Sequence, residues 1–160
     1  MSHIQTEKHA IQVDAWISQI PPGLTSDRIV FLFADAIWAV QKRAVTTLSE
    51  VTLTAVFDRV IHQSQKEFPL LSGMKYESRG ISMDGILSQM NRYPPDEIIK
   101  ALRFFLVELL TILDNLTAGI LTKPLYKALS GITGERRGPQ LDAVSQISSY
   151  RRVGRDREDV

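Results

Sequence analysis

Cysteine is absent from the 160 residues of this chain, which excludes a disulfide-stapled fold, a thiolate metal site and a cysteine nucleophile. An excess of charge of one sign is also missing, because 19 lysine and arginine residues face 18 aspartate and glutamate residues, for a formal net charge of +1. This balance produces no overall field that favours nucleic acid or an anionic membrane as a partner. The hydrophobic content of 44% is too high for a wholly disordered chain. We therefore expect a globular domain with its own core.

Long uncharged apolar runs are scarce. Residues 1–10 are polar and lack the apolar run of a secretory signal. The most apolar stretch, residues 104–122, is nearly long enough to span a membrane, but Glu108, Asp114 and Asn115 lie within it. We interpret this stretch as a buried helix of a soluble protein, favour no membrane contact and expect a cytoplasmic location.

Apolar residues recur at helical spacing along most of the chain, which predicts an all-α fold, a helical bundle of about five helices. The predicted helices cover residues 8–20, 25–46, 49–68, 82–92 and 95–122, with one or two further turns at 125–129. In the first helix, Ile11, Ala15, Trp16 and Ile20 form the repeating set. Residues 74–77 are expected to form a short extended piece.

The predicted helix over 49–68 has the clearest pattern. Leu53, Phe57 and Val60 share its inward face, whereas His62 lies on the polar face. Thr47 and Glu50 fit a capping box in which Thr47 is the N-cap residue. A helix start after a break at residues 47–49 is therefore expected.

The long helix predicted over 95–122 is apolar around about half of its circumference, whereas an ordinary surface helix needs only about 100°. The arc predicted to face inward includes Leu109, Leu113, Leu116 and Ile120. We expect a central helix, or one that also contacts another chain.

The character of the chain changes near residue 133, which divides it into a bundle domain (1–132) and a charged, flexible C-terminal tail (133–160). A weak helix is expected over 140–150. A helix-turn-helix over 125–150 is not favoured as a DNA-binding element, because its second helix has no internal arginine. The pair Arg136 and Arg137 is better interpreted as a solvated loop than as a phosphate site.

The three histidines do not form a metal site by spacing, since His3 and His9 lie in the polar start of the chain and His62 lies elsewhere. We expect neither a metal nor a cofactor. His62, four residues after Asp58, has the placement of a phosphoacceptor on a bundle helix, although the flanking residues typical of such sites are missing. An ordinary surface histidine is the favoured interpretation.

Two lines of apolar side chains lie off the main faces of the predicted helices: Phe31, Trp38 and Val45 on the second helix, and Phe104 and Val107 on the fifth. A monomer would leave such side chains in water, so we predict that these residues form the interface of a homodimer. Alternatively, Phe31, Trp38, Phe104 and Glu108 line a pocket for a small molecule, with Glu108 as its polar contact.

Paired carboxylates, a hydroxyl nucleophile with a base, and a glycine-rich phosphate loop are all missing as sequence patterns. The sequence therefore favours a non-enzymatic regulatory or signal-transduction module that acts through protein–protein interaction, as a homodimer and with a protein partner in a regulatory pathway. The alternatives are a small-molecule-binding helical sensor and a phosphorelay component that uses His62.

Overall fold

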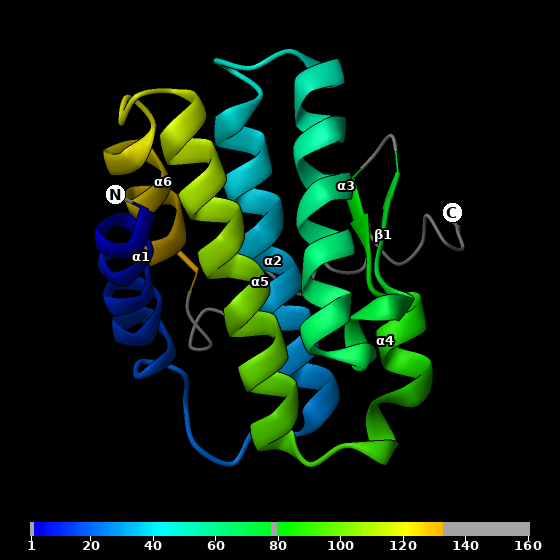
Figure 1. The fold of residues 1–160 in the computed structure, drawn as a ribbon. Helices are drawn as coiled ribbons and strands as arrows, with labels where there is room; N and C mark the ends of the chain where they lie inside the picture. The colour runs from blue at the N-terminus through cyan, green and yellow to red at the C-terminus, as the bar shows by residue number, and fades with distance from the viewer. Residues whose placement is uncertain (1, 78–79, 133–160) are drawn as a thin grey trace, which may run out of the picture.

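The computed structural model describes residues 2–77 and 80–132, which form an all-α bundle with one small hairpin (Figure 1). The helices are α1 (Ser2–Ile17), α2 (Ser26–Ala44), α3 (Glu50–Glu67), α4 (Asp84–Gln89), α5 (Pro95–Leu116) and α6 (Thr122–Ser130). Two 3-10 turns, Pro69–Gly73 and Met90–Arg92, flank α4 and the hairpin of β1 (Lys75–Glu77) and β2 (Gly80–Ser82). The predicted tail (133–160), its weak helix and the Arg136–Arg137 pair lie outside the described residues.

Helix α5 is the central helix, as its wide apolar arc predicts. It packs against α1, α2, α3 and α6, and Leu102, Phe105 and Leu109 are fully buried on it. Within residues 2–77 and 80–132, none of the helices combines the length and apolar character needed to span a membrane.

The end predicted for the long helix was wrong, because α5 ends at Leu116 rather than near residue 122. Ala118 and Gly119 have φ angles of 52° and 83°, in the left-handed region, and the Gly119 N–H donates to the Asp114 carbonyl at 3.0 Å. The chain therefore turns out of the helix although the apolar spacing continues. As a result Leu116 and Ile120, predicted to face inward, are exposed.

Helix α1 begins earlier and faces differently than predicted, since it covers Ser2–Ile17 rather than residues 8–20. Over residues 6–17, its buried side chains are His9, Val13 and Trp16, spaced four and three residues apart. Ile11, which belongs to the apolar set that recurs at helical spacing, is exposed. The apolar repeat does not reveal this buried face, because histidine is polar and His9 therefore does not contribute to the repeat.

Helix α3 confirms its predicted face: Leu53, Phe57 and Val60 are buried. Its N-cap residue is Ser49, whose Oγ accepts from the Thr52 N–H at 3.1 Å, so the assignment of Thr47 as the cap was wrong. Thr47 belongs to the turn after α2, where its N–H donates to the Ala44 carbonyl at 3.0 Å.

The extended piece expected at residues 74–77 is β1, and it pairs antiparallel with β2. The Tyr76 ring of β1 stacks on Phe57 with ring centroids 4.3 Å apart, which docks the hairpin on α3. The helix predicted over 82–92 is shorter, because α4 ends at Gln89 and a 3-10 turn follows.

Candidate functional site

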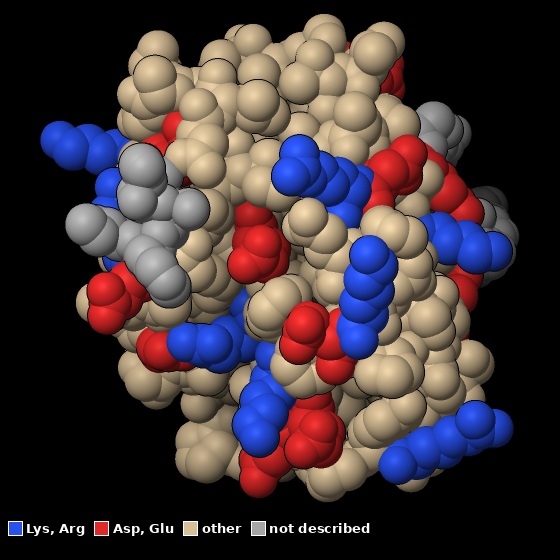
Figure 2. Space-filling model, viewed as in Figure 1, with Lys and Arg blue, Asp and Glu red and all other residues tan. Residues whose placement is uncertain are grey.

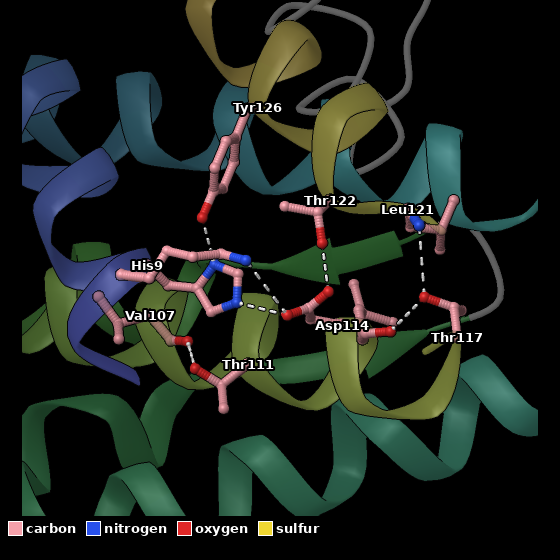
Figure 3. A network of polar contacts seen from close by, with 10 residues as sticks. His9, Val107, Thr111, Asp114, Thr117, Leu121, Thr122 and Tyr126 are labelled. Carbon is pink, nitrogen blue, oxygen red and sulfur yellow. Dashed lines mark hydrogen bonds and ion pairs between the residues drawn. The ribbon is translucent and has the colours of Figure 1, made fainter. Parts of the chain in front are cut away.

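A cluster of polar side chains is buried where α1, α5 and α6 meet (Figure 3). His9 comes from α1, Asp114 from α5, and Thr122 and Tyr126 from α6; we call these four residues the His9 cluster. His9 and Asp114 are 1% and 3% exposed. Buried polar groups are stable only when they are hydrogen-bonded, so their partners decide what the cluster does.

The two ring nitrogens of His9 have different partners. Nε2 lies 3.2 Å from Asp114 Oδ2, and Nδ1 lies 2.7 Å from the Tyr126 hydroxyl oxygen. An ionised carboxylate only accepts hydrogen bonds, so Nε2 carries the proton and donates to Asp114. Nδ1 then accepts from the Tyr126 hydroxyl. The arrangement satisfies a neutral imidazole of one defined tautomer.

The Asp114 carboxylate accepts two hydrogen bonds and forms one ion pair, all with residues of two other helices. Besides His9, the Thr122 hydroxyl donates to Oδ1, and the Lys8 ammonium lies 4.0 Å from Oδ2. The neighbouring Thr117 hydroxyl donates instead to the Leu113 carbonyl of its own helix at 2.9 Å. The Asp114 carboxylate is thus the point at which α1, α5 and α6 are joined.

Burial and hydrogen bonding set the charges of the cluster. Burial lowers the pKa of His9 below 6.5, against the opposing effect of Asp114. Burial by itself raises the pKa of Asp114, but hydrogen bonds from Thr122 and His9 outweigh it and lower the pKa below 3.8. Burial, with the Asp114 charge, raises the pKa of Tyr126 to about 12. At neutral pH the cluster holds a neutral imidazole, a carboxylate and a neutral phenol.

The order carboxylate–imidazole–hydroxyl resembles that of a catalytic triad, but its chemistry differs. The hydroxyl is a phenol whose raised pKa of about 12 keeps its proton in place, and the imidazole is covered by protein. The cluster therefore fastens three helices rather than activating a nucleophile. In residues 2–77 and 80–132, no three histidine, aspartate or glutamate side chains are grouped to hold a metal ion.

Sequence reasoning missed the His9 cluster, because His9 was assigned to the polar start of the chain. The available signal was the spacing of His9, Val13 and Trp16, which places the histidine on the buried face of α1. Asp114 was noticed only as a charge inside an apolar stretch. Its partners lie on other helices, and that proximity is invisible in a local pattern.

Two of the side chains predicted to line a small-molecule pocket, Trp38 and Phe104, contact different residues. Trp38 is partly exposed beside Gly80 of β2, with the Lys42 ammonium 4.6 Å from its ring centroid. Phe104 is half-buried against Phe68, with ring centroids 5.5 Å apart. Phe31 is half-buried, and so is Glu108, where burial raises the pKa of the carboxyl.

The residues predicted for a dimer interface differ in accessibility. Val45 is exposed, whereas Val107 is buried, so its assignment to an outward-facing line of the long helix was wrong. Val107 lies inside because α5 is covered on several sides. His62, the phosphoacceptor candidate, is exposed on α3 as the polar-face assignment predicts.

A second feature is the concentration of exposed apolar side chains at one end of the bundle. Val45, Val51, Leu116 and Ile120 are between 51% and 81% exposed. Val45 and Ile120 belong to the α2–α3 and α5–α6 connections, which lie at the same end, at the top of Figure 1. Val51 lies in the first turn of α3 and Leu116 is the last residue of α5, next to these connections.

Residues 45–57 and 115–122, which we call the apolar end, contain one charged residue, Glu50. Figure 2 shows this end as mostly uncharged surface, while charged side chains crowd the middle and the opposite end.

The chain matches no protein-family model, no curated protein and no solved structure. The evidence for the function of this protein therefore comes from its own structure, in the buried His9 cluster and the apolar end.

Proposed function

We propose that this protein is a non-enzymatic interaction module of the regulatory or signal-transduction type, which associates with a second copy of itself through the apolar end. The carrying observation is that four of the six large exposed hydrophobic side chains of the described residues lie at this end, on segments with one charged residue. Exposed apolar side chains that gather on one part of a protein are typical of interaction sites, whereas singly scattered ones are not. The cytoplasmic location expected from the sequence and a further protein partner stay predictions.

A second copy of the chain is the expected partner of the apolar end, because two nearly uncharged surfaces can pair without repulsion between like charges. Two-fold pairing places the same residues on both sides, so each exposed side chain contributes twice. Burial of an aliphatic side chain of this size stabilises a complex by roughly 1.5 to 3 kcal/mol when it is complete. Because association itself costs at least about 4 kcal/mol, we expect a dimer in the micromolar range rather than a permanent one.

The apolar line predicted on the second helix, which includes Trp38 and Val45, leads to the apolar end. Val45 belongs to the apolar end and directly follows α2, and Trp38 lies two turns earlier, within α2. Because Trp38 contacts Lys42 and lies beside Gly80, part of its ring is already covered within the chain. We therefore place the centre of the interface at Val51 and Ile120, with Trp38 at its edge.

Sedimentation equilibrium tests the proposal with single charge insertions. Val51→Glu and Ile120→Glu each put two like charges in contact across the two-fold axis, and we expect each to raise the dimer dissociation constant at least tenfold. Val51 lies in the first turn of α3, where a carboxylate is compatible with the helix dipole, so this variant is expected to fold. Ile11→Glu is the matched control, because Ile11 is also an exposed aliphatic residue, 66% exposed, on the side of the bundle.

Two results would contradict the proposal. A parent protein that stays monomeric at hundreds of micromolar has no such interface. A loss of association in Ile11→Glu, with Val51→Glu unaffected, would place the interface on α1 instead of the apolar end.

A further inference from the structure

The hydrogen bond between Tyr126 and His9 joins a phenol to a base. The Tyr126 hydroxyl oxygen lies 2.7 Å from His9 Nδ1, and the two rings meet edge to face with centroids 5.6 Å apart. Since the imidazole proton is on Nε2, the lone pair of Nδ1 faces the phenol O–H. A separation of about 2.6 to 3.2 Å is the range in which a side chain takes a proton directly. A base is therefore already in place to take the Tyr126 proton.

The same two contacts of His9 also satisfy the ring after it has taken up this proton. The imidazolium would donate from Nε2 to Asp114 Oδ2 at 3.2 Å and from Nδ1 to the Tyr126 oxygen at 2.7 Å. Its positive charge would lie beside the Asp114 carboxylate, which stays ionised because its pKa lies below 3.8. The proton can therefore pass from Tyr126 to His9 and back while every side chain keeps its place.

The proton leaves Tyr126 only when the phenol also loses an electron. The resting phenol has a pKa of about 12, whereas the pKa of His9 lies below 6.5, so the proton stays on the Tyr126 oxygen. Removal of one electron makes the O–H a strong acid, because the positive charge left on the ring weakens that bond. With His9 as the acceptor, the electron and the proton leave together and no charged phenol radical is formed. Oxidation of Tyr126 then needs less free energy than oxidation of a tyrosine without a base.

We propose that Tyr126 is a one-electron donor site, at which a small oxidising radical takes an electron from the phenol while His9 takes its proton. The Tyr126 O–H bond breaks, a His9 Nδ1–H bond forms, and the oxidant is reduced by one electron. The products are a neutral tyrosyl radical and an imidazolium beside the unchanged Asp114 carboxylate. A one-electron reductant such as a thiol reverses the step, and the proton returns to the phenol. The step uses no residue of the apolar end, so this inference does not depend on the proposed self-association.

Burial gives the two rings of this site different exposure. Tyr126 is half-buried, so an oxidant at the surface comes close to its ring, whereas His9 is 1% exposed and shielded from bulk water. Tyr76 is also half-buried, but its phenol oxygen accepts from Gln41 Nε2 at 3.2 Å. An amide does not take up the phenol proton, so Tyr76 is an internal comparison of similar burial without a base.

Two variants of the full chain, each with a single tyrosine, test this inference. Tyr76→Phe, Tyr93→Phe and Tyr150→Phe together leave Tyr126. The matched control keeps Tyr76 and changes the other three, and both variants keep the two tryptophans, so tryptophan oxidation affects them equally. A ruthenium(III) polypyridyl complex generated by a laser flash is the oxidant, and transient absorption of the tyrosyl radical measures its rate of formation. We expect the radical to form at least about tenfold faster at Tyr126 than at Tyr76.

Adding His9→Gln to the Tyr126 variant removes the base and keeps an acceptor for the hydrogen bond. The glutamine amide oxygen still accepts from Tyr126 but does not take up its proton, so the rate should fall to that of the Tyr76 control. Electron–nuclear double resonance of the trapped radical gives a signature that a purely structural contact would not produce. With His9 present we expect a coupled proton that disappears on exchange into D₂O, because Nδ1–H donates to the radical oxygen.

The proposal is overturned if Tyr126 is oxidised no faster than Tyr76, or if His9→Gln leaves the Tyr126 rate unchanged. Should the His9→Gln variant fail to fold, the resonance experiment on the protein that retains His9 decides. A Tyr126 radical without an exchangeable hydrogen-bonded proton would contradict the transfer to His9.

Discussion

Gly73 and Gly85 pack backbone against backbone where the 3-10 turn after α3 meets α4. A Cβ atom on Gly85 would lie 2.4 Å from the Gly73 carbonyl oxygen, and one on Gly73 would lie 2.5 Å from the Gly85 carbonyl carbon. Side-chain atoms do not approach backbone this closely, so only glycine fits at either position. This crossing lets α4 pack on the turn that follows α3.

Replacing Gly85 by alanine should therefore destabilise the fold strongly. The clash is with backbone that no side-chain rotation relieves, and we expect Gly85→Ala to lower the free energy of unfolding by about 3 kcal/mol. Urea denaturation measures this change. Gly131→Ala is the matched control, because its nearest contact to an added Cβ is 3.5 Å and its φ is −78°. Equal effects of the two substitutions would show that the crossing is not tight.

Ser49 and Thr47 offer a direct comparison of cap assignments. Ser49→Ala removes the oxygen that accepts from the Thr52 N–H, and we expect a loss of about 1 kcal/mol in unfolding free energy. Thr47→Ala should change it by less than about 0.5 kcal/mol, because Thr47 is an exposed turn residue. Urea denaturation of both variants measures the difference, and the reverse order would restore Thr47 as the cap.

Asp114→Asn tests whether the Asp114 carboxylate holds α1, α5 and α6 together. The carboxylate accepts from both His9 and Thr122, whereas an amide has a single oxygen and turns its NH₂ toward one of those donors. We expect a loss of about 2 kcal/mol at neutral pH. The pKa of His9 should fall further, because Asp114 is what raises it. An NMR titration of His9 that moves upward would contradict the assigned contact.

Lowering the pH should reduce the free energy of unfolding of the parent protein through the His9 cluster. The lowered pKa of His9 adds stability that is present above pH 6.5 and lost as the pH falls below it. The lowered pKa of Asp114 adds stability that is present above pH 3.8 and lost below it. Urea unfolding of the parent at pH 7.5 and 5.0 should therefore show lower stability at 5.0. His9→Gln should reduce the difference and His62→Gln should preserve it.

Trp38→Asp tests the edge of the proposed interface. We expect helical circular dichroism to be retained, since the ring is partly exposed, and self-association to weaken less than with Val51→Glu. Sedimentation measures both variants at the same concentrations. If Trp38→Asp abolishes association while Val51→Glu leaves it intact, the interface lies on the α2 face.

The spacing of apolar residues along the sequence predicted the buried face of those helices that bury a single side. The spacing of Leu53, Phe57 and Val60 gave the buried side of α3, because a 3.6-residue repeat must turn its apolar side inward. The same logic made α5 central, since an arc of about 180° needs neighbours on several sides. It failed at the end of α5, where Ala118 and Gly119 enter the left-handed region while the apolar repeat continues.

The amino-acid sequence alone predicted an all-α bundle around a central long helix, because helical periodicity is visible in residues three and four positions apart. The tertiary structure alone decided which distant side chains meet. His9 and Asp114 are 105 residues apart and meet only when α1 packs on α5. The apolar end likewise exists only because the connections at residues 45–49 and 117–121 reach the same end of the bundle. A local repeat shows which side of a helix is buried, but not which distant side chain will lie against it.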